Sequence, residues 1–237
     1  MNALHTPERI RHAVGVVGGE IDRRLRDELA QPWTEARLWT ELSCCILSSQ
    51  VPYPLAQAAA ARLCESEVFL DSCRSPATLE IALTDLLCED LEVGGERRRY
   101  RFPNSRARQL ARTWTEVHRD GGGLKRLLES FEDHRAARAW FVRNAPGLGP
   151  KQASMFLRNI GATYELAVLD RHVIGYMLIM GLANDGAPTR TMSGYVRDED
   201  VLRDHAAGFG LRVGLLDWAV WIVMRVASGR AAKELTA

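Results

Sequence analysis

Residues 144–161 read NAPGLGPKQASMFLRNIG, and this stretch decides the fold that the sequence predicts. It contains the turn Pro146-Gly147-Leu148-Gly149 followed by Pro150, which suits the first position of a helix because its missing N–H costs nothing there. Glycines in the turn let the backbone take positive φ and approach a partner closely. The pattern therefore predicts two helices joined by a short turn, with Leu148 tucked between them.

The N-terminus of the second helix of this pair predicts an anion site. Its first N–H groups have no partner within the helix, and they carry the positive end of the helix dipole. A DNA phosphate is a natural occupant of such a site. We therefore expect the turn around Gly147 and Gly149 to bind the DNA backbone.

Lys151 lies in the first turn of this second helix, in a chain that otherwise uses arginine almost everywhere. Lys125 and Lys233 are the only other lysines among 31 basic residues. An ammonium can lose its proton whereas a guanidinium cannot, and the helix dipole and any partial burial favour the neutral amine. A neutral amine is a nucleophile. The alternative is that Lys151 binds phosphate only as a positive charge.

Asp170 follows the apolar run Leu166–Leu169 and directly precedes another predicted helix. A carboxylate in this position caps a helix by accepting hydrogen bonds from its first N–H groups. A carboxylate that faces the same cleft as Lys151 can also stabilise a cation forming at the sugar C1′ and shuttle protons during elimination. We expect Asp170 to be a cap and a catalytic residue.

Helical patterns dominate the rest of the chain, and no stretch shows a convincing strand pattern. For example, Leu38, Leu42 and Cys45 repeat on one face of a helix, as core-facing residues do. The sequence therefore predicts an all-α fold. We expect helices at about 34–51, 55–64, 76–86, 105–119, 124–130, 135–144, 150–160, 171–182, 198–205 and 212–227, with Ser105 as the cap of the fourth and a polar loop at 183–197.

These helices group into four predicted parts. Residues 1–32 form an N-terminal helix that packs with a C-terminal subdomain, residues 162–237. Residues 33–130 form a central helical bundle, and residues 131–161 form the helix-hairpin-helix.

The composition is that of an ordinary globular protein of one large or two small domains, with 237 residues, 46% hydrophobic and 26% charged. No apolar run is long enough for a membrane span, and the N-terminus lacks the apolar core of a signal peptide, so we expect a cytoplasmic protein. The cysteines are odd in number and lack Cys-x-x-Cys spacing, which indicates reduced thiols and neither a disulfide frame nor a zinc site. All precede the quoted stretch: Cys44, Cys45, Cys64, Cys73 and Cys88.

Positive charge gathers between Glu96 and Arg112, in ERRRYRFPNSRARQLAR, although the net charge of the whole chain is only +1. Seven arginines lie around a Pro-Asn-Ser turn in this stretch. They predict a surface that faces DNA phosphates, with Arg101 and Arg106 among its contacts. The alternative is a solvated arginine face without a ligand.

Two groups of residues together resemble the helix-hairpin-helix DNA glycosylase superfamily, which has a Gly-Pro-Asp signature. They are Pro146-Gly147-x-Gly149-x-Lys151-x-Ala153 and Val168-Leu169-Asp170-Arg171-His172. Within the superfamily the chain is most similar to the compact archaeal-type 8-oxoguanine DNA glycosylase/lyases. Three further stretches carry this narrower resemblance: Glu41–Gln50, Tyr100–Ala107 and Leu215–Trp221.

The resemblance implies two helical subdomains that flank a cleft, into which a damaged nucleotide is flipped from duplex DNA. Lys151 would attack C1′ of the sugar, displace the base and form a Schiff base, after which elimination nicks the strand. Asp170 would stabilise charge on the sugar and help activate Lys151. Carbonyl oxygens near Gly147 and Gly149 would hold a monovalent cation, and no other metal or cofactor is expected.

The resemblance also separates the subfamilies. Relatives of the endonuclease III type carry cysteines for an iron–sulfur cluster after the catalytic region, and here no Cys follows Lys151. Monofunctional alkylbase glycosylases lack the catalytic Lys. A lyase-competent enzyme remains, and we expect it to be a nucleoid-associated monomer without an iron–sulfur cluster that acts on duplex DNA.

Four residues are expected at the damaged base by the same resemblance. Met155 would stack on the base, and Asp217 would hydrogen-bond the guanine edge. Trp221 would stack on the other face of the base, and Gln50 would fill the hole left in the duplex. Each has an ordinary alternative. Met155 is as typical of a core, aromatic residues on a late helix such as Trp221 are more often core, and Trp218 competes with Trp221 for the role. Gln50 is also explained as a polar residue at the end of a helix.

Two other functions fit the same residues. One is a non-catalytic helix-hairpin-helix protein that binds DNA and senses lesions, and the other is the same chemistry on a different damaged base. The presence of both Lys151 and Asp170 favours an enzyme, since a protein that only binds DNA needs neither. Lys233 in the C-terminal tail is a further candidate base contact, which stays open because the chain runs on past it.

Overall fold

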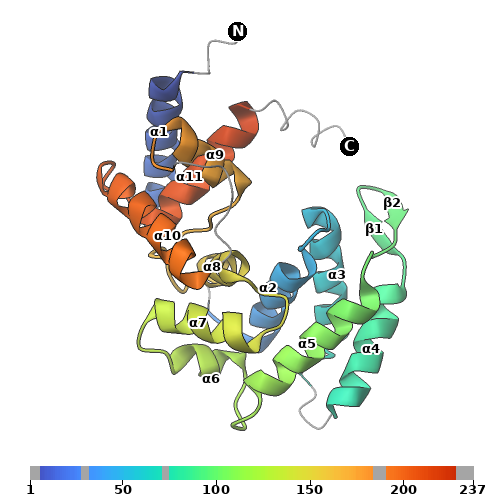
Figure 1. Ribbon diagram of the computed structural model, residues 1–237. Coiled ribbons are helices and arrows are strands. Elements are labelled where there is room, and N and C mark those ends of the chain that lie inside the picture. Colours follow the sequence, from blue (N-terminus) through green and yellow to red (C-terminus); the bar gives the residue numbers. More distant parts are fainter. Residues whose placement is uncertain (1–5, 28–31, 71–74, 184–190, 228–237) are drawn as a thin grey trace. The chain divides into compact units, whose positions relative to one another are not determined.

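The structure is a computed structural model that describes residues 6–27, 32–70, 75–183 and 191–227. In these ranges the chain forms 11 helices and two short strands (Figure 1), so the prediction of a helical fold is confirmed. The chain separates into two compact units. The central unit consists of residues 32–160, and the terminal unit consists of residues up to 31 together with those from 161 onward.

The central unit is built around α2 (Glu35–Leu47), which is buried along most of its length. The Thr34 side chain caps α2 by accepting a hydrogen bond from the Arg37 N–H. The other helices of the unit are α3 (Tyr53–Glu65), α4 (Pro76–Cys88), α5 (Pro103–Val117), α6 (Leu124–Glu129), α7 (His134–Asn144) and α8 (Pro150–Asn159). Because α2 packs against α3, α5, α6 and α8, its apolar residues form the centre of this core.

A short β-hairpin lies between α4 and α5, where the sequence predicted no strand. β1 (Leu91–Val93) pairs antiparallel with β2 (Glu96–Arg98). Gly94 and Gly95 take φ of 62° and 81°, the left-handed pair that a two-residue hairpin turn requires. The prediction was wrong because strands of 3 residues are too short to show an alternating pattern, which left the Gly-Gly pair as the one local signal.

The predicted cap of α5 was also wrong. α5 begins at Pro103, so Ser105 lies inside the helix, where its hydroxyl donates to the carbonyl of Phe102. Proline suits the first helical position, and it sets this helix start two residues before the serine.

The terminal unit has a core formed by both ends of its chain. Its helices are α1 (Pro7–Asp27), α9 (Arg171–Ile179), α10 (Met192–Ala207) and α11 (Val213–Ala227). α1 lies along α11, and α9 packs against α11 as well (Figure 1). Val14, Tyr176, Leu202 and Leu216 contribute to this core, one from each helix. No helix in the described ranges combines the length and the apolar character needed to cross a membrane.

α10 begins inside the stretch 183–197 that was predicted as a loop, so the prediction was wrong from Met192 onward. The Thr191 side chain accepts a hydrogen bond from the Gly194 N–H and caps the helix. Gly194 is buried there, so a glycine that the sequence suggests as a helix breaker is instead a packing residue. Residues 184–190 lie outside the described part of the chain.

Candidate active site

α7 and α8 form the predicted pair of helices joined by a short turn. Within the turn the Leu148 N–H donates to the Ala145 carbonyl (3.1 Å), and the Leu148 side chain is only 4% exposed, as predicted. α8 starts at Pro150, and its N-cap residue Gly149 has no side chain to bond its first N–H groups. These groups suit the predicted anion site.

Gly147 is the turn position that requires glycine. Its φ is +96°, a conformation that other residues rarely adopt. A Cβ at this position would lie 2.6 Å from Gln109 Oε1 and 3.4 Å from Ile46 Cγ2. Gly149 has an extended backbone, and the atom nearest to an added Cβ is the flexible end of Gln152 at 3.3 Å.

Gly147→Ala should lower the free energy of unfolding by about 1–3 kcal/mol, because the added methyl group meets Gln109 and the backbone is left-handed. Gly149→Ala is the matched control, and its loss should be smaller by at least about 1 kcal/mol. Urea unfolding followed by circular dichroism measures both losses. Equal losses would show that the turn does not depend on the conformation of Gly147.

Lys151 lies in the first turn of α8 and is half-buried. In the part of the chain that the structure describes, its amine has no hydrogen-bond or ion-pair partner. Met155 is half-buried one turn further along the same face of α8. On the buried side of α8, Ser154 accepts a hydrogen bond from Arg138 of α7 (3.2 Å), a guanidinium side chain that is 1% exposed. The Lys151 amine is therefore unpaired among the described residues, on a helix that is bonded to α7 through Arg138.

Cys44, Cys45, Cys64 and Cys88 are free thiols, and Cys73 lies outside the described residues. Burial raises the pKa of the Cys44 thiol to about 12 and that of Cys45 well above its ordinary value. These two thiols stay protonated and are poor nucleophiles. Within the described ranges, no three His, Cys, Asp or Glu side chains gather to hold a metal ion.

Asp170 caps α9, as the sequence predicts. Its Oδ1 accepts hydrogen bonds from the N–H groups of His172 (2.8 Å) and Val173 (2.9 Å). Both bonds end on the same oxygen, and Oδ2 has no partner among the described residues. The side chain is half-buried. One oxygen thus fixes the carboxylate, and the other is available for chemistry.

Asp217 is not positioned to hydrogen-bond the edge of a guanine, contrary to the prediction from the sequence. The side chain is 1% exposed, and its Oδ2 accepts a hydrogen bond from the Val168 N–H (2.5 Å). A carboxylate that is buried and bonded to the backbone in this way is not presented to the edge of a flipped base. The structure therefore corrects the prediction: Asp217 is a structural acceptor in the segment that leads to Asp170.

Trp221 lies one turn beyond Asp217 on α11, and it is 37% exposed. A ring exposed to this extent is not a core side chain, so that alternative is wrong. The Arg225 guanidinium lies 4.4 Å from the centre of the ring, a cation–π contact that covers one face. Trp218 is half-buried. The stacking of Trp221 on a damaged base stays a prediction.

Gln50 is an exposed residue with φ of 62°, in the turn that follows α2. A residue other than glycine in this conformation is strained, and such strain is common at functional sites. That Gln50 fills the hole left in the duplex by the flipped base stays a prediction.

Arg106 supports the turn that contains Gln50 and does not face solvent. It is 9% exposed and donates to the Ser49 carbonyl (3.0 Å) and to Gln109 Oε1 (2.6 Å). Gln109 in turn borders Gly147. The prediction that Arg106 binds phosphate is corrected, because its guanidinium is buried and two of its nitrogens bond Gln109 and Ser49, while Nε has no partner among the described residues.

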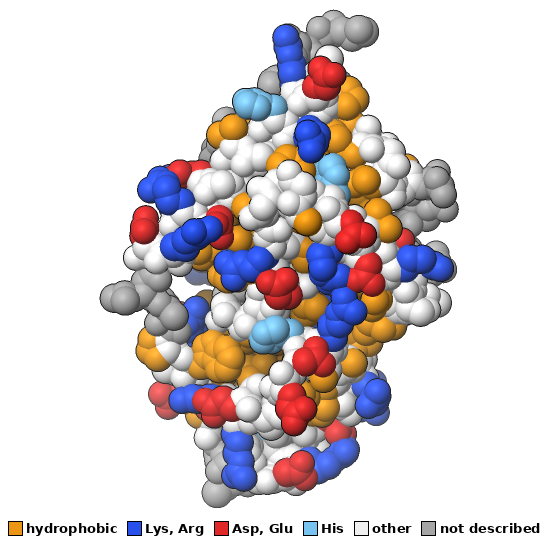
Figure 2. Space-filling model, turned by 90° about the vertical axis from the view of Figure 1, so that its left-hand side faces the viewer, with side chains coloured by type: hydrophobic (Ala, Val, Ile, Leu, Met, Phe, Trp, Pro, Cys, Tyr) orange, Lys and Arg blue, Asp and Glu red, His pale blue; other side chains and the backbone are white. Residues whose placement is uncertain are grey.

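Three of the six remaining arginines of the basic stretch pair with acidic residues. Arg98 pairs with Glu96, Arg99 with Asp90, and Arg108 with Glu80. Figure 2 shows one face of the molecule, on which the described acidic and basic side chains are interspersed. Arg101 is exposed and stacks on Phe102 at 4.9 Å, so it stays a candidate phosphate contact.

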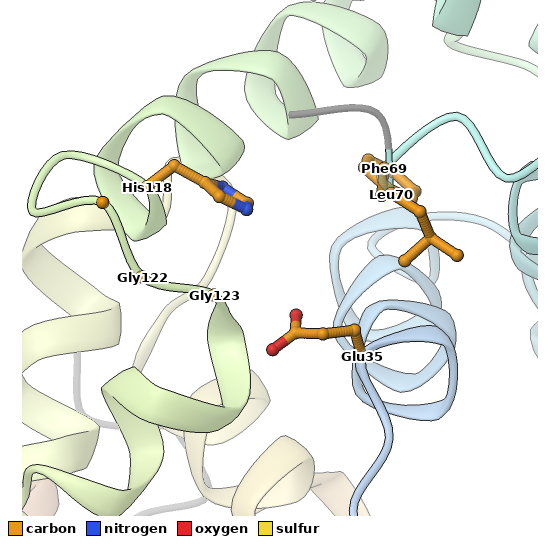
Figure 3. Close-up of a pocket in the computed structure, with 7 residues that line it drawn as sticks. Glu35, Phe69, Leu70, His118, Gly122 and Gly123 are labelled. Atoms are coloured by element: carbon orange, nitrogen blue, oxygen red, sulfur yellow. The ribbon is translucent and has the colours of Figure 1, made fainter. Parts of the chain in front are cut away.

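A cavity of ≈ 360 Å³ in the central unit contains none of the predicted site residues (Figure 3). Its polar side chains are already engaged. The Glu35 carboxylate accepts from the N–H groups of Leu124 (3.0 Å) and Lys125 (2.8 Å), and His118 Nδ1 bonds the Trp114 carbonyl (2.9 Å). The cavity is therefore not the candidate active site.

The candidate site residues are divided between the two units. Lys151, Met155, Gly147 and Gln50 lie in the central unit, and Asp170 and Trp221 lie in the terminal unit. The sequence prediction missed Tyr195 and Glu199, which bond the backbone before Asp170. Tyr195 bonds a residue 26 positions away and Glu199 one 32 positions away, so no local pattern reveals them. Lys233 lies outside the described residues.

Comparisons with known proteins agree with the resemblance seen in the sequence. A protein of Korarchaeum cryptofilum named 8-oxoguanine DNA glycosylase/AP lyase is 27% identical over 205 residues, which cover 86% of this chain and 87% of that protein. A protein of the same name from Thermotoga petrophila is 30% identical over 197 residues, 83% of this chain and 84% of its own. The crystal structure of the 8-oxoguanine DNA glycosylase of Thermotoga maritima matches with a TM-score of 0.66 and 26% identity, covering 91% of this chain and 93% of that one.

The family model described as 8-oxoguanine DNA glycosylase, with its helix-hairpin-helix, matches residues 21–211. This span includes the turn at Gly147, Lys151 and the cap residue Asp170. The chain therefore belongs to the 8-oxoguanine DNA glycosylase family of helix-hairpin-helix proteins.

Proposed function

We propose that this protein is a bifunctional DNA glycosylase and lyase that removes 8-oxoguanine from duplex DNA. The observation that carries the proposal is the half-buried amine of Lys151, which has no partner among the described residues and lies in the first turn of α8, directly after a glycine turn suited to a phosphate. The relatives named 8-oxoguanine DNA glycosylase/AP lyase support the choice of base.

The proposed reaction begins at the sugar of the flipped nucleotide. The neutral amine of Lys151 attacks C1′ while the bond to the base breaks, and the base leaves with the bonding electrons and takes up a proton. Opening of the sugar ring gives a Schiff base between Lys151 Nζ and C1′. Loss of a C2′ proton then expels the 3′ phosphate and nicks the strand. Water finally releases the sugar and frees the amine.

Asp170 supplies a base and a negative charge to the same reaction. Its Oδ2 accepts the proton that the Lys151 ammonium must lose, and the carboxylate stabilises positive charge that develops on the sugar. Because Oδ1 is held by two N–H groups of α9, the carboxylate does not need to reorganise during the reaction.

The proposed contacts with duplex DNA are made mainly through the backbone. The first N–H groups of α8 and the turn from Gly147 to Gly149 bind a phosphate, and turn carbonyls hold a monovalent cation. Arg101 adds a charged contact, and Met155 and Gln50 act at the flipped base and at the hole it leaves. The reaction needs no further cofactor, since Lys151 is the nucleophile. The protein would act as a monomer on the chromosome.

Borohydride trapping on duplex oligonucleotides tests this proposal. A covalent adduct with a duplex containing 8-oxoguanine, and none with an undamaged duplex, is the expected result. No adduct on either duplex, with DNA binding intact, would favour the non-catalytic alternative. An adduct on a duplex with another damaged base but none with 8-oxoguanine would keep the chemistry and change the substrate.

Trp221→Ala should weaken binding to lesion DNA more than binding to undamaged DNA. Stacking of an aromatic ring on a base contributes about 1–3 kcal/mol, so we expect a loss of about 5- to 150-fold in affinity for the lesion duplex. Fluorescence anisotropy with a duplex that carries a non-cleavable lesion analogue measures the change. Equal losses on both duplexes would mean that Trp221 does not contact the base.

A further inference from the structure

The segment that leads to Asp170 is buried but belongs to no helix or strand. Residues 166–169 lie directly before the cap of α9, and all four side chains are buried. Buried backbone groups need hydrogen-bond partners, because an unpaired N–H away from water is costly. We call residues 166–169 the leader segment.

Three consecutive N–H groups of the leader segment are bonded by side chains. The Ala167 N–H donates to Glu199 Oε1 (2.7 Å), and the Val168 N–H donates to Asp217 Oδ2 (2.5 Å). The Leu169 N–H donates to the Tyr195 hydroxyl (3.1 Å), which itself donates to the Ala167 carbonyl (2.8 Å). Among described residues, no backbone carbonyl accepts these three N–H groups. The leader segment is thus held by side chains of α10 and α11.

These side chains are among the most buried polar groups of the terminal unit. Glu199 is fully buried, Asp217 and Tyr195 nearly so. Arg203 extends the arrangement, since it pairs with Glu199 (3.3 Å) and donates to the Glu165 carbonyl (3.1 Å). The bonds to the leader segment offset part of their cost of desolvation.

The leader segment is hydrogen-bonded directly to the backbone of Asp170, the residue that carries the catalytic carboxylate. The Asp170 N–H donates to the Val168 carbonyl (2.8 Å). Val168 is also the residue whose N–H donates to Asp217. The backbone of Asp170 is therefore fixed from one side by the leader segment and its carboxylate from the other by α9. A shift of about 1 Å in such a group can cost about 100-fold in rate.

We propose that Tyr195, Glu199 and Asp217 are positioning residues that hold Asp170 in its reactive place. The inference rests on the proposed function, because it gives these residues a role in the same excision reaction. It also replaces base reading as the role of Asp217. The three act through the leader segment and touch no substrate.

Tyr195→Phe tests the inference, because it removes only the hydroxyl that bonds Leu169 and Ala167. Tyr176→Phe is the matched control: Tyr176 is a buried tyrosine of the same unit, and its hydroxyl bonds His205 (2.9 Å) away from the leader segment. We expect Tyr195→Phe to lower the single-turnover rate of 8-oxoguanine excision at least about tenfold, and Tyr176→Phe less than about threefold. Equal rate losses in the two variants would overturn the inference.

A double mutant separates positioning from a general loss of stability. In an Asp170→Asn background the same Tyr195→Phe change should lower the residual rate less than about threefold, since the group it positions is already impaired. An undiminished tenfold effect in that background would also overturn the inference.

Asp217 provides a second variant in case Tyr195→Phe does not fold. Asp217→Asn keeps an oxygen that can accept the Val168 N–H, whereas Asp217→Ala removes it. We expect excision at saturating enzyme to fall at least about tenfold in Asp217→Ala and to be largely restored in Asp217→Asn. Weaker binding of lesion DNA by Asp217→Ala with an unchanged excision rate would overturn positioning and support base reading.

Failure of the inference and failure of the proposed function give different results. If the wild-type protein does not excise 8-oxoguanine, the proposed function fails. Amide hydrogen exchange then still tests the leader segment: Leu169 should exchange at least about tenfold faster in Tyr195→Phe and not in Tyr176→Phe. If the wild-type protein excises the base and Tyr195→Phe matches it, only the inference fails.

Discussion

Lys151→Gln should abolish strand scission and borohydride trapping on an 8-oxoguanine duplex while the duplex is still bound. Glutamine is polar and of similar length, but its amide nitrogen cannot form a Schiff base. Since the nucleophile is lost, we expect the single-turnover rate of cleavage to fall at least about 10³-fold. Denaturing gels measure the cleavage, and fluorescence anisotropy measures the affinity for the duplex.

Lys125→Gln is the matched control for this change. Lys125 is the second residue of α6, as Lys151 is of α8, but it is exposed and lies 3.9 Å from Glu129. Its cleavage rate should stay within about twofold of wild type, as expected for an exposed surface residue. Cleavage by Lys151→Gln at the wild-type rate would remove this lysine from the mechanism.

Asp170→Asn should slow base excision by about 10²- to 10⁴-fold with little loss of stability. Asparagine caps helices about as well as aspartate, so the bonds to the N–H groups of His172 and Val173 can persist. The amide cannot accept a proton from Lys151 or offset positive charge on the sugar. Single-turnover excision and thermal unfolding are measured on the same preparation.

Asp133→Asn controls for capping. Asp133 caps α7 with bonds to the N–H groups two and three residues ahead, as Asp170 caps α9. The substitution should leave excision within about threefold of wild type, with a similarly small change in melting temperature. If Asp170→Asn loses stability and keeps its excision rate, Asp170 is a cap and not a catalytic residue.

Features encoded by neighbouring residues were predicted well. The turn at Gly147, the helix start at Pro150 and the cap at Asp170 each depend on residues a few positions apart, so their patterns are visible in the chain. Competing local signals reduced this accuracy. α5 begins at Pro103, although Ser105 was the predicted cap. The three-residue strands around Gly94 were too short to form a pattern.

The sequence by itself determined the helical fold and the helix-hairpin-helix, and it is the source of the proposal that Lys151 and Asp170 are the reactive pair. Only the tertiary structure decided which of the other polar residues are available to a ligand. Arg106 and Asp217 bond backbone groups 57 and 49 residues distant, and these partners bury them. Asp217 and Trp221 are one turn apart on α11, yet one is 1% and the other 37% exposed. Burial depends on what packs against a helix, and residues far apart in the chain leave no local pattern from which to predict it.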